Sequence, residues 1–183
     1  LTNPGFFTYI PTTLSDGNLA VEINSANNGN HWAKIRVVGT GYVGIGRNNR
    51  DGVGAMVKFT PDGGKTIMHP VTDGESHAST NALEVNVGLG DAVQGTVEVD
   101  WPNPGTGKSV RNKLYDVQAG EKVLFPEIPC SYDVVGQSRK DFDKCLKTAL
   151  QALRHPGVEL ISNPDGYKRF TDNMLRAYDE SAH

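Results

Sequence analysis

The sequence predicts a mainly β protein, with an antiparallel β-sandwich or barrel-like domain over residues 1–128 and an α-helical extension over residues 129–183. Three observations predict this fold. Up to about Phe125, short apolar or alternating runs are separated by clusters of Gly, Asn, Asp and Pro. No long helical segment stands between those runs, which favours a sandwich or barrel over a parallel α/β sheet. After Cys130 the apolar residues recur at helical spacing instead.

The runs before Phe125 have the composition of β-strands. In VEVDW, residues 97–101, the apolar side chains share one face and Glu98 and Asp100 share the other, which is typical of a half-buried strand. PDGG, residues 61–64, predicts a hairpin turn between two strands. The predicted strands are residues 19–24, 33–38, 53–60, 66–71, 82–87, 96–101 and 122–125.

Two amphipathic helices are expected in the extension. Ser138 can cap the first, which Pro156 stops, and the second is expected to start near Asp165. We expect both apolar stripes to pack on the β-domain. The alternative is that the second stripe docks on a protein partner, because a terminal amphipathic helix with two tyrosines is a common recognition element. The stripes comprise Phe142, Cys145, Leu146, Ala149, Leu150 and Leu153, and then Tyr167, Phe170, Met174, Leu175 and Tyr178.

Composition excludes several classes of protein. The chain has 183 residues, of which 37% are hydrophobic and 21% charged, so it can bury a sizeable core without a metal ion or disulfide. A net charge of -3 without a Lys/Arg cluster argues against nucleic acid as a partner. No apolar run approaches the length of a transmembrane segment.

The two cysteines, Cys130 and Cys145, are too few for a zinc site, which needs four ligands in paired clusters. A disulfide between them would indicate an oxidising compartment. Two reduced, partly buried thiols are the alternative, and the two cysteines alone leave both interpretations open.

The stretch VVGTGYVG, residues 37–44, places three glycines in the G-x-G-x-x-G spacing of a dinucleotide-binding loop. That motif requires a helix after the loop. The next residues, IGRNNRDGVGAMVKF, contain too many Gly, Asn and Asp residues for a stable amphipathic helix. The acidic residue expected about twenty positions later would have to be Asp62, which lies in the PDGG turn. We therefore expect no nucleotide cofactor here.

One candidate metal site lies in NNRDG, which supplies Asn48, Asn49 and Asp51. Amide and carboxylate oxygens in a glycine-containing loop are suitable ligands for calcium. Asn and Asp side chains also stabilise turns without any ion, so a purely structural role is the alternative. Calcium is the only cofactor that the sequence suggests.

A candidate ligand-binding group consists of Asn27, Asn28, Trp32 and Arg50. The two amides and the aromatic face of Trp32, in SANNGNHW, could bind a sugar. The alternative for Trp32 is a place in the core.

A catalytic constellation is not recognisable in the sequence. Ser76 and Ser79 lie near His77, but no G-x-S-x-G elbow surrounds them, and the carboxylates are spread singly. We therefore expect a protein that is not an enzyme.

Six motifs, taken in order, resemble the ASPIC/UnbV domain found in cartilage acidic protein and its bacterial relatives. The resemblance covers roughly residues 28–125. It implies that the glycine stretch is an expanded hairpin between the GNHW strand and the NRDGVGA strand, with its glycines serving turns. The sequence departs from the family pattern at Met56, His77 and Val87. The motifs are GNHW at 29–32, NRDGVGA at 49–55, the glycine turn at 63–64, GESHAS at 74–79, GLG at 88–90 and VEVDWP at 97–102.

The resemblance implies an extracytoplasmic, non-catalytic β-domain associated with calcium-bearing neighbours, matrix or cell-surface adhesion. It predicts a binding, adhesion or assembly module of a larger secreted, periplasmic, lumenal or cell-surface complex. The expected partner is a protein, contacted through the C-terminal helices, and a glycan is a second candidate. A carbohydrate-binding or carbohydrate-active enzyme domain is the alternative function.

Overall fold

The computed structural model describes residues 29–74, 83–102, 108–155, 160–161 and 164–181. Contacts divide the chain into two units, Leu1–Asn30 and His31–His183, and the fold described here is that of the second unit. The predicted boundary at 128/129 falls inside this unit. The predicted strand at 19–24, the candidate residues Asn27 and Asn28, and the serine and histidine residues of GESHAS lie outside the described residues.

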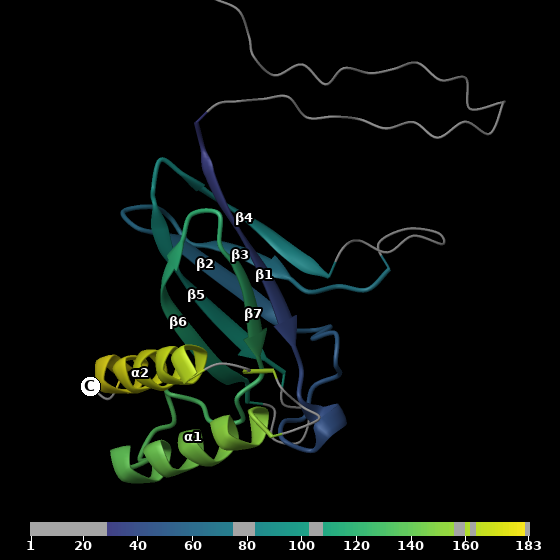
Figure 1. Ribbon diagram of the computed structural model, residues 1–183, viewed down its shortest axis with the longest axis vertical. Coiled ribbons are helices and arrows are strands. Elements are labelled where there is room, and N and C mark those ends of the chain that lie inside the picture. Colours follow the sequence, from purple (N-terminus) through teal and green to yellow (C-terminus); the bar gives the residue numbers. More distant parts are fainter. Residues whose placement is uncertain (1–28, 75–82, 103–107, 156–159, 162–163, 182–183) are drawn as a thin grey trace, which may run out of the picture. The chain divides into compact units, whose positions relative to one another are not determined.

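The strands of the second unit form two sheets, and the predicted mainly β fold with a helical appendage is confirmed (Figure 1). In the three-stranded sheet, β1 (His31–Val38) lies between β4 (Glu84–Gly90), which is antiparallel to it, and β7 (Lys122–Pro126), which is parallel. The four-stranded sheet is antiparallel throughout. Its order is β3 (Ile67–Pro70), β2 (Met56–Pro61), β5 (Gln94–Trp101) and β6 (Val110–Gln118).

Strand β6 was not predicted from the sequence, so the predicted list of strands is incomplete. Its alternation is hidden because Asn112, a polar residue, faces the core, and because Asp116 has a positive φ of 54°. Asn112 is fully buried, and its Oδ1 accepts a hydrogen bond of 2.8 Å from the indole nitrogen of Trp101. A polar residue that is satisfied inside the core gives no apolar signal in the sequence.

The expected hairpin between the GNHW and NRDGVGA strands is also wrong. Strand β1 belongs to the three-stranded sheet and β2 to the four-stranded sheet, so the segment between them crosses from one sheet to the other. It contains one short 3-10 helix, η2 (Gly41–Val43). The turn predicted at PDGG does join an antiparallel pair, β2 and β3.

The core lies on the inner faces of the two sheets and continues under the helices. The alternation predicted for VEVDW is confirmed, since Val97, Val99 and Trp101 are fully buried. On β1 the buried positions are Ala33, Ile35 and Val37. Because side chains alternate along a strand, Glu98 and Asp100 must project from the opposite, outer face of their sheet.

Helix α1 (Arg139–Leu153) begins at the predicted cap, where Ser138 Oγ accepts a hydrogen bond from the backbone nitrogen of Asp141. Helix α2 (Pro164–Ser181) packs against β6 and α1 (Figure 1). Its predicted stripe is buried or half-buried, and the rings of Phe170 and Phe125 meet edge to face at 5.5 Å. The packing interpretation of this stripe is therefore confirmed, which leaves the polar face of α2 to solvent.

A disulfide joins Cys130, in the segment after β7, to Cys145 in α1. The open choice between a disulfide and two thiols is thereby decided. The bond ties the helical appendage covalently to the end of the β-domain. Neither α1 nor α2, within the described part of the chain, combines the length and the apolar character that crossing a bilayer requires.

Candidate functional site

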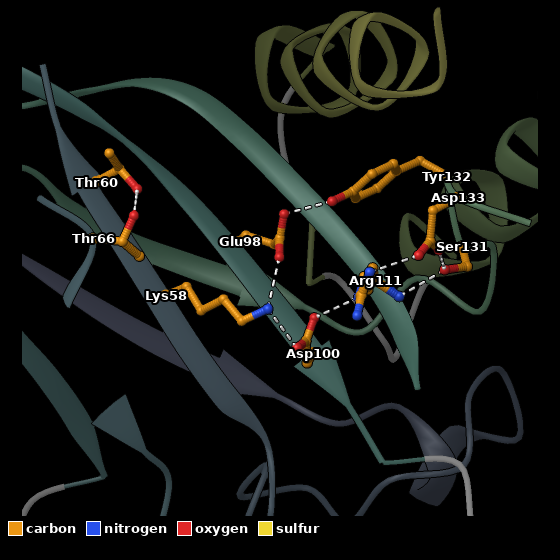
Figure 2. Close-up of polar contacts among 9 residues, drawn as sticks. All are labelled: Lys58, Thr60, Thr66, Glu98, Asp100, Arg111, Ser131, Tyr132 and Asp133. Atoms are coloured by element: carbon orange, nitrogen blue, oxygen red, sulfur yellow. Dashed lines mark hydrogen bonds and ion pairs between the residues drawn. The ribbon is translucent and has the colours of Figure 1, made fainter. Parts of the chain in front are cut away.

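The outer face of the four-stranded sheet carries a row of paired charges (Figure 2). The Nζ atom of Lys58, on β2, lies 3.0 Å from Glu98 Oε1 and 2.7 Å from Asp100 Oδ2, both on β5. Asp100 is also paired with Arg111 on β6, with 3.1 Å between Oδ1 and Nε. The strand register produces these pairs, because it sets Lys58 opposite Glu98 and Asp100 opposite Arg111.

The row continues into the segment that follows β7 (Figure 2). Arg111 Nη1 lies 2.9 Å from Asp133 Oδ2, and Ser131 Oγ donates to the other oxygen of Asp133 at 2.6 Å. The hydroxyl of Tyr132 donates to Glu98 Oε2. We call these seven residues the polar network: Lys58, Glu98, Asp100, Arg111, Ser131, Tyr132 and Asp133.

Three members of the polar network, Lys58, Glu98 and Tyr132, have pKa values displaced away from neutral pH. Burial alone would lower the pKa of Lys58, but its bonds to Asp100 and Glu98 raise that pKa above the ordinary value. Burial would raise the pKa of Glu98, yet the hydrogen bonds from Tyr132 and Lys58 bring it below the ordinary value. Burial and the Glu98 carboxylate both raise the pKa of Tyr132. Acid–base catalysis needs a group that titrates near the working pH, and these three do not.

The lowered pKa of Glu98 predicts how stability depends on pH. The contribution of Glu98 is complete above its ordinary pKa of 4.5 and is lost as the pH falls through the lower folded-state value. We expect Glu98→Gln to cost about 2 kcal/mol at neutral pH, because charged hydrogen bonds are lost. The variant should also lose less stability than wild type between about pH 6 and pH 3. Urea unfolding across this range measures both effects.

The control for that experiment is Glu84→Gln. The Glu84 carboxylate is exposed and makes a 3.5 Å ion pair with Lys34, so its replacement should leave both the stability and its pH slope close to wild type. Parallel pH profiles for wild type and Glu98→Gln would contradict the prediction. Glu121 and Glu180 also have lowered pKa values, so a reduced slope is expected rather than a flat one.

A surface cavity of about 290 Å³ lies next to the polar network. It has hydroxyl groups on one side, where Thr60 Oγ1 and Thr66 Oγ1 are 2.8 Å apart (Figure 2). The Lys113 ammonium lies 4.8 Å from the centre of the Tyr115 ring. The cavity can therefore offer donors and acceptors to a polar ligand. Its lining consists of Lys58, Thr60, Thr66, Thr96, Glu98, Lys113 and Tyr115.

The segment between β1 and β2, residues 39–55, which we call the glycine loop, closes around the carboxylate of Glu127. This side chain is 2% exposed. Its Oε2 accepts from the backbone nitrogens of Thr40 at 2.9 Å and Asn48 at 3.0 Å, and its Oε1 accepts from the backbone nitrogen of Arg47 at 3.0 Å. Backbone N–H groups that converge in this way form a binding site for an anion. The anion in this site belongs to the chain itself.

Close packing explains the glycines of this loop. A Cβ atom on Gly39 would lie 2.0 Å from the carbonyl oxygen of Asn49, and one on Gly46 would lie 2.3 Å from the carboxyl carbon of Glu127. Gly44 ends η2 in the left-handed conformation, with φ 73°. The expectation that glycines here serve turns is confirmed, and no helix follows η2 in the glycine loop. The nucleotide-like spacing reflects the approach of the loop to itself and to Glu127.

The three residues of the candidate calcium site make separate contacts within the chain. The Nδ2 atom of Asn48 donates to Glu127 Oε1 at 2.7 Å. The side-chain amide of Asn49 bonds the backbone of Val53, four residues later, through both its nitrogen and its oxygen at 3.0 Å and so closes a turn. Asp51 pairs with Arg36 at 2.8 Å. These contacts support structural roles. Calcium binding stays a prediction. It is tested by comparing the thermal unfolding midpoint of the protein in EDTA with that in calcium.

The candidate ligand residues Trp32 and Arg50 are not brought together. Trp32 lies near the beginning of β1, whereas Arg50 lies in the glycine loop beyond the end of that strand, with its guanidinium 5.7 Å from the centre of the Tyr42 ring. The interpretation of Trp32 as a core residue is wrong, because its side chain is 45% exposed. Ala33 faces the core, so the alternation of β1 turns Trp32 outward.

Two features of these sites were missed in the sequence. Glu127 stands between Pro126 and Ile128 in an apolar run, and an isolated carboxylate in such a run is a signal of a buried, bonded group. Alternation along each strand predicts that Lys58 and Glu98 point outward from the sheet. It does not predict which strands are neighbours in that sheet. The polar network therefore could not be assembled from local pattern alone.

The chain is similar to a known protein family over part of its length. The family model described as ASPIC and UnbV matches residues 44–129. This span includes most of the glycine loop, the four-stranded sheet and Glu127. A search of curated proteins and a search of solved structures each found no match to the chain.

Proposed function

Residues 44–129 form an ASPIC and UnbV domain, and on this premise we propose that the chain is a non-catalytic binding module of a larger extracytoplasmic assembly. Domains of this family occur in extracellular and surface proteins, which supports a secreted, periplasmic, lumenal or cell-surface location. The disulfide between Cys130 and Cys145 supports an oxidising compartment.

The polar network carries the non-catalytic part of this proposal. Each of its charges is paired with an opposite charge within the chain, and the pKa values of Lys58, Glu98 and Tyr132 all move away from neutrality. Such groups can orient a ligand, but they are poor proton donors and acceptors at the pH where the protein works. The arrangement therefore favours binding over acid–base catalysis.

The segment before α1 supports a protein partner on the helical side of the unit. The side chain of Val135 is 99% exposed, and Val134 beside it is exposed as well. Both residues line two neighbouring surface cavities of about 570 and 430 Å³. Exposed apolar side chains beside surface cavities are typical of protein interaction sites. We place the docking of a protein partner at this segment.

The test uses the tagged full chain returned to its native host. We expect wild type to elute with stoichiometric partners, and Val135→Asp to weaken the assembly by about tenfold or more, because a desolvated carboxylate is costly in an interface. Met68→Asp is the matched control, since Met68 is also exposed but lies on the edge strand β3. Elution of wild type as a lone monomer would reject the proposal, as would equal loss of assembly in both variants.

The exposed position of Trp32 favours a second candidate, a carbohydrate-binding role.

A further inference from the structure

The outer face of the three-stranded sheet presents one large aromatic ring among polar side chains. Trp32, Lys34 and Arg36 share this face of β1, because the alternate residues between them are buried. Trp32 is half exposed, whereas the other tryptophan, Trp101, is fully buried. Because so much of the Trp32 side chain is exposed, apolar ring surface is left in contact with water.

Glycines border Trp32 on β4 and just before β7. The register sets Trp32 opposite Gly88 on β4, and its carbonyl oxygen accepts a hydrogen bond from the backbone nitrogen of Gly120, just before β7. A Cβ atom added at either glycine would meet no heavy atom within 4 Å. The indole therefore does not pack over these glycines, and the space next to their Cα atoms is open.

The polar side chains around the ring pair with one another. Lys34 lies 3.5 Å from Glu84, Arg36 lies 2.8 Å from Asp51, and Asn86 is exposed opposite Lys34. Lys122, an exposed lysine on β7 opposite Lys34, adds one charge to this face, so its net charge is small, which favours an uncharged ligand over a strongly charged one. The exposed amide and carboxylate offer both donors and acceptors to hydroxyl groups.

We propose that this face binds a neutral saccharide, with a sugar ring stacked on Trp32 and its hydroxyls bonded to Asn86, Lys34 and Glu84. A sugar ring has an apolar C–H face and a rim of hydroxyls, which matches one aromatic surface bordered by polar groups. On strands β1, β4 and β7 the large apolar side chains that are exposed are Trp32 and Leu124, so the ring is bordered mainly by polar groups. This inference rests on the proposed binding function and names a ligand for it.

The test titrates the full chain with neutral hexasaccharides of glucose, mannose and xylose and follows tryptophan fluorescence and heat. Because Trp101 is buried, stacking should change the emission of Trp32 alone. We expect saturable binding of at least one hexasaccharide, weakened about tenfold or more by Trp32→Ala and only a few fold by Trp32→Phe. Asn86→Ala should weaken binding as well.

Tyr42→Ala is the matched control, because Tyr42 is an exposed aromatic residue outside this face, and it should bind like wild type. Absence of a signal with all three hexasaccharides, at concentrations up to about 10 mM, would overturn the inference, as would equal losses in Tyr42→Ala and Trp32→Ala. The assembly assay keeps the two proposals apart. Trp32→Ala should still assemble with the protein partner, whereas Val135→Asp should still bind the saccharide.

Discussion

Replacing Glu127 with alanine is expected to lower the free energy of unfolding by about 3–5 kcal/mol, because several buried donors would lose a charged acceptor at once. The carboxylate is 2% exposed and accepts from the backbone nitrogens of Thr40, Arg47 and Asn48. Without it, several buried donors lose their acceptor, and each unsatisfied donor costs about 1–3 kcal/mol. Since domains have a total stability of about 5–15 kcal/mol, this variant should be close to unfolding.

Urea unfolding followed by circular dichroism measures the effect, and two variants accompany it. Glu127→Gln keeps one carbonyl acceptor, so we expect an intermediate loss. Glu84→Ala removes an exposed carboxylate and should stay within about 0.5 kcal/mol of wild type. If Glu127→Ala proved as stable as Glu84→Ala, the carboxylate would not be what holds the glycine loop.

Hydrogen exchange in Glu127→Gln keeps this prediction testable even if the alanine variant fails to fold. The amides of Thr40, Arg47 and Asn48 should exchange faster than in wild type, because their acceptor has been weakened. Amides in the centre of β5, such as Val99, should be unaffected. Uniform acceleration across the chain would instead indicate a global loss of stability.

Features encoded by neighbouring residues were predictable from the sequence. The alternation of Val97, Val99 and Trp101 identified the buried face of β5, because the period of two is a local property of a strand. Ser138 marked the start of α1, because a cap bonds a nitrogen three residues away. The apolar stripe of α2 was likewise predictable, because its residues recur at helical spacing.

Features that depend on distant residues were not predictable. Glu127 contacts Thr40, Arg47 and Asn48 across 79 to 87 positions of the chain, and no local pattern encodes such a pairing. The order of the strands is subject to the same limit. Strands β1 and β2 lie in different sheets, although the sequence suggested that they form one hairpin. The first two glycines of VVGTGYVG are explained by the close approach of Asn48 and Asn49, and Thr40 between them donates its backbone N–H to Glu127, which lies outside that stretch.

Removing the disulfide should produce a loss of about 3 kcal/mol, the chain-entropy contribution of a loop of this size. Cys130 and Cys145 are fifteen residues apart, and the loop between them includes three residues of the polar network and the exposed Val134 and Val135. Cys130→Ala/Cys145→Ala should unfold at lower urea concentration than wild type. A phosphine reductant should destabilise wild type by a similar amount and leave the double variant unchanged.

The loss should be concentrated at the helical end of this loop. At its other end, the amide of Asn112 donates to the carbonyl oxygens of Ile128 and Cys130 at 3.0 and 3.1 Å, so this segment stays bonded to β6 without the disulfide. Helix α1 is held otherwise by apolar packing of residues such as Phe142 and by the 2.7 Å ion pair between Arg139 and Asp179 on α2, so the disulfide is its covalent tie to this segment. Hydrogen exchange should therefore accelerate in α1 more than in β6. Equal acceleration in both would mean that the disulfide stabilises the unit as a whole rather than the attachment of its helices.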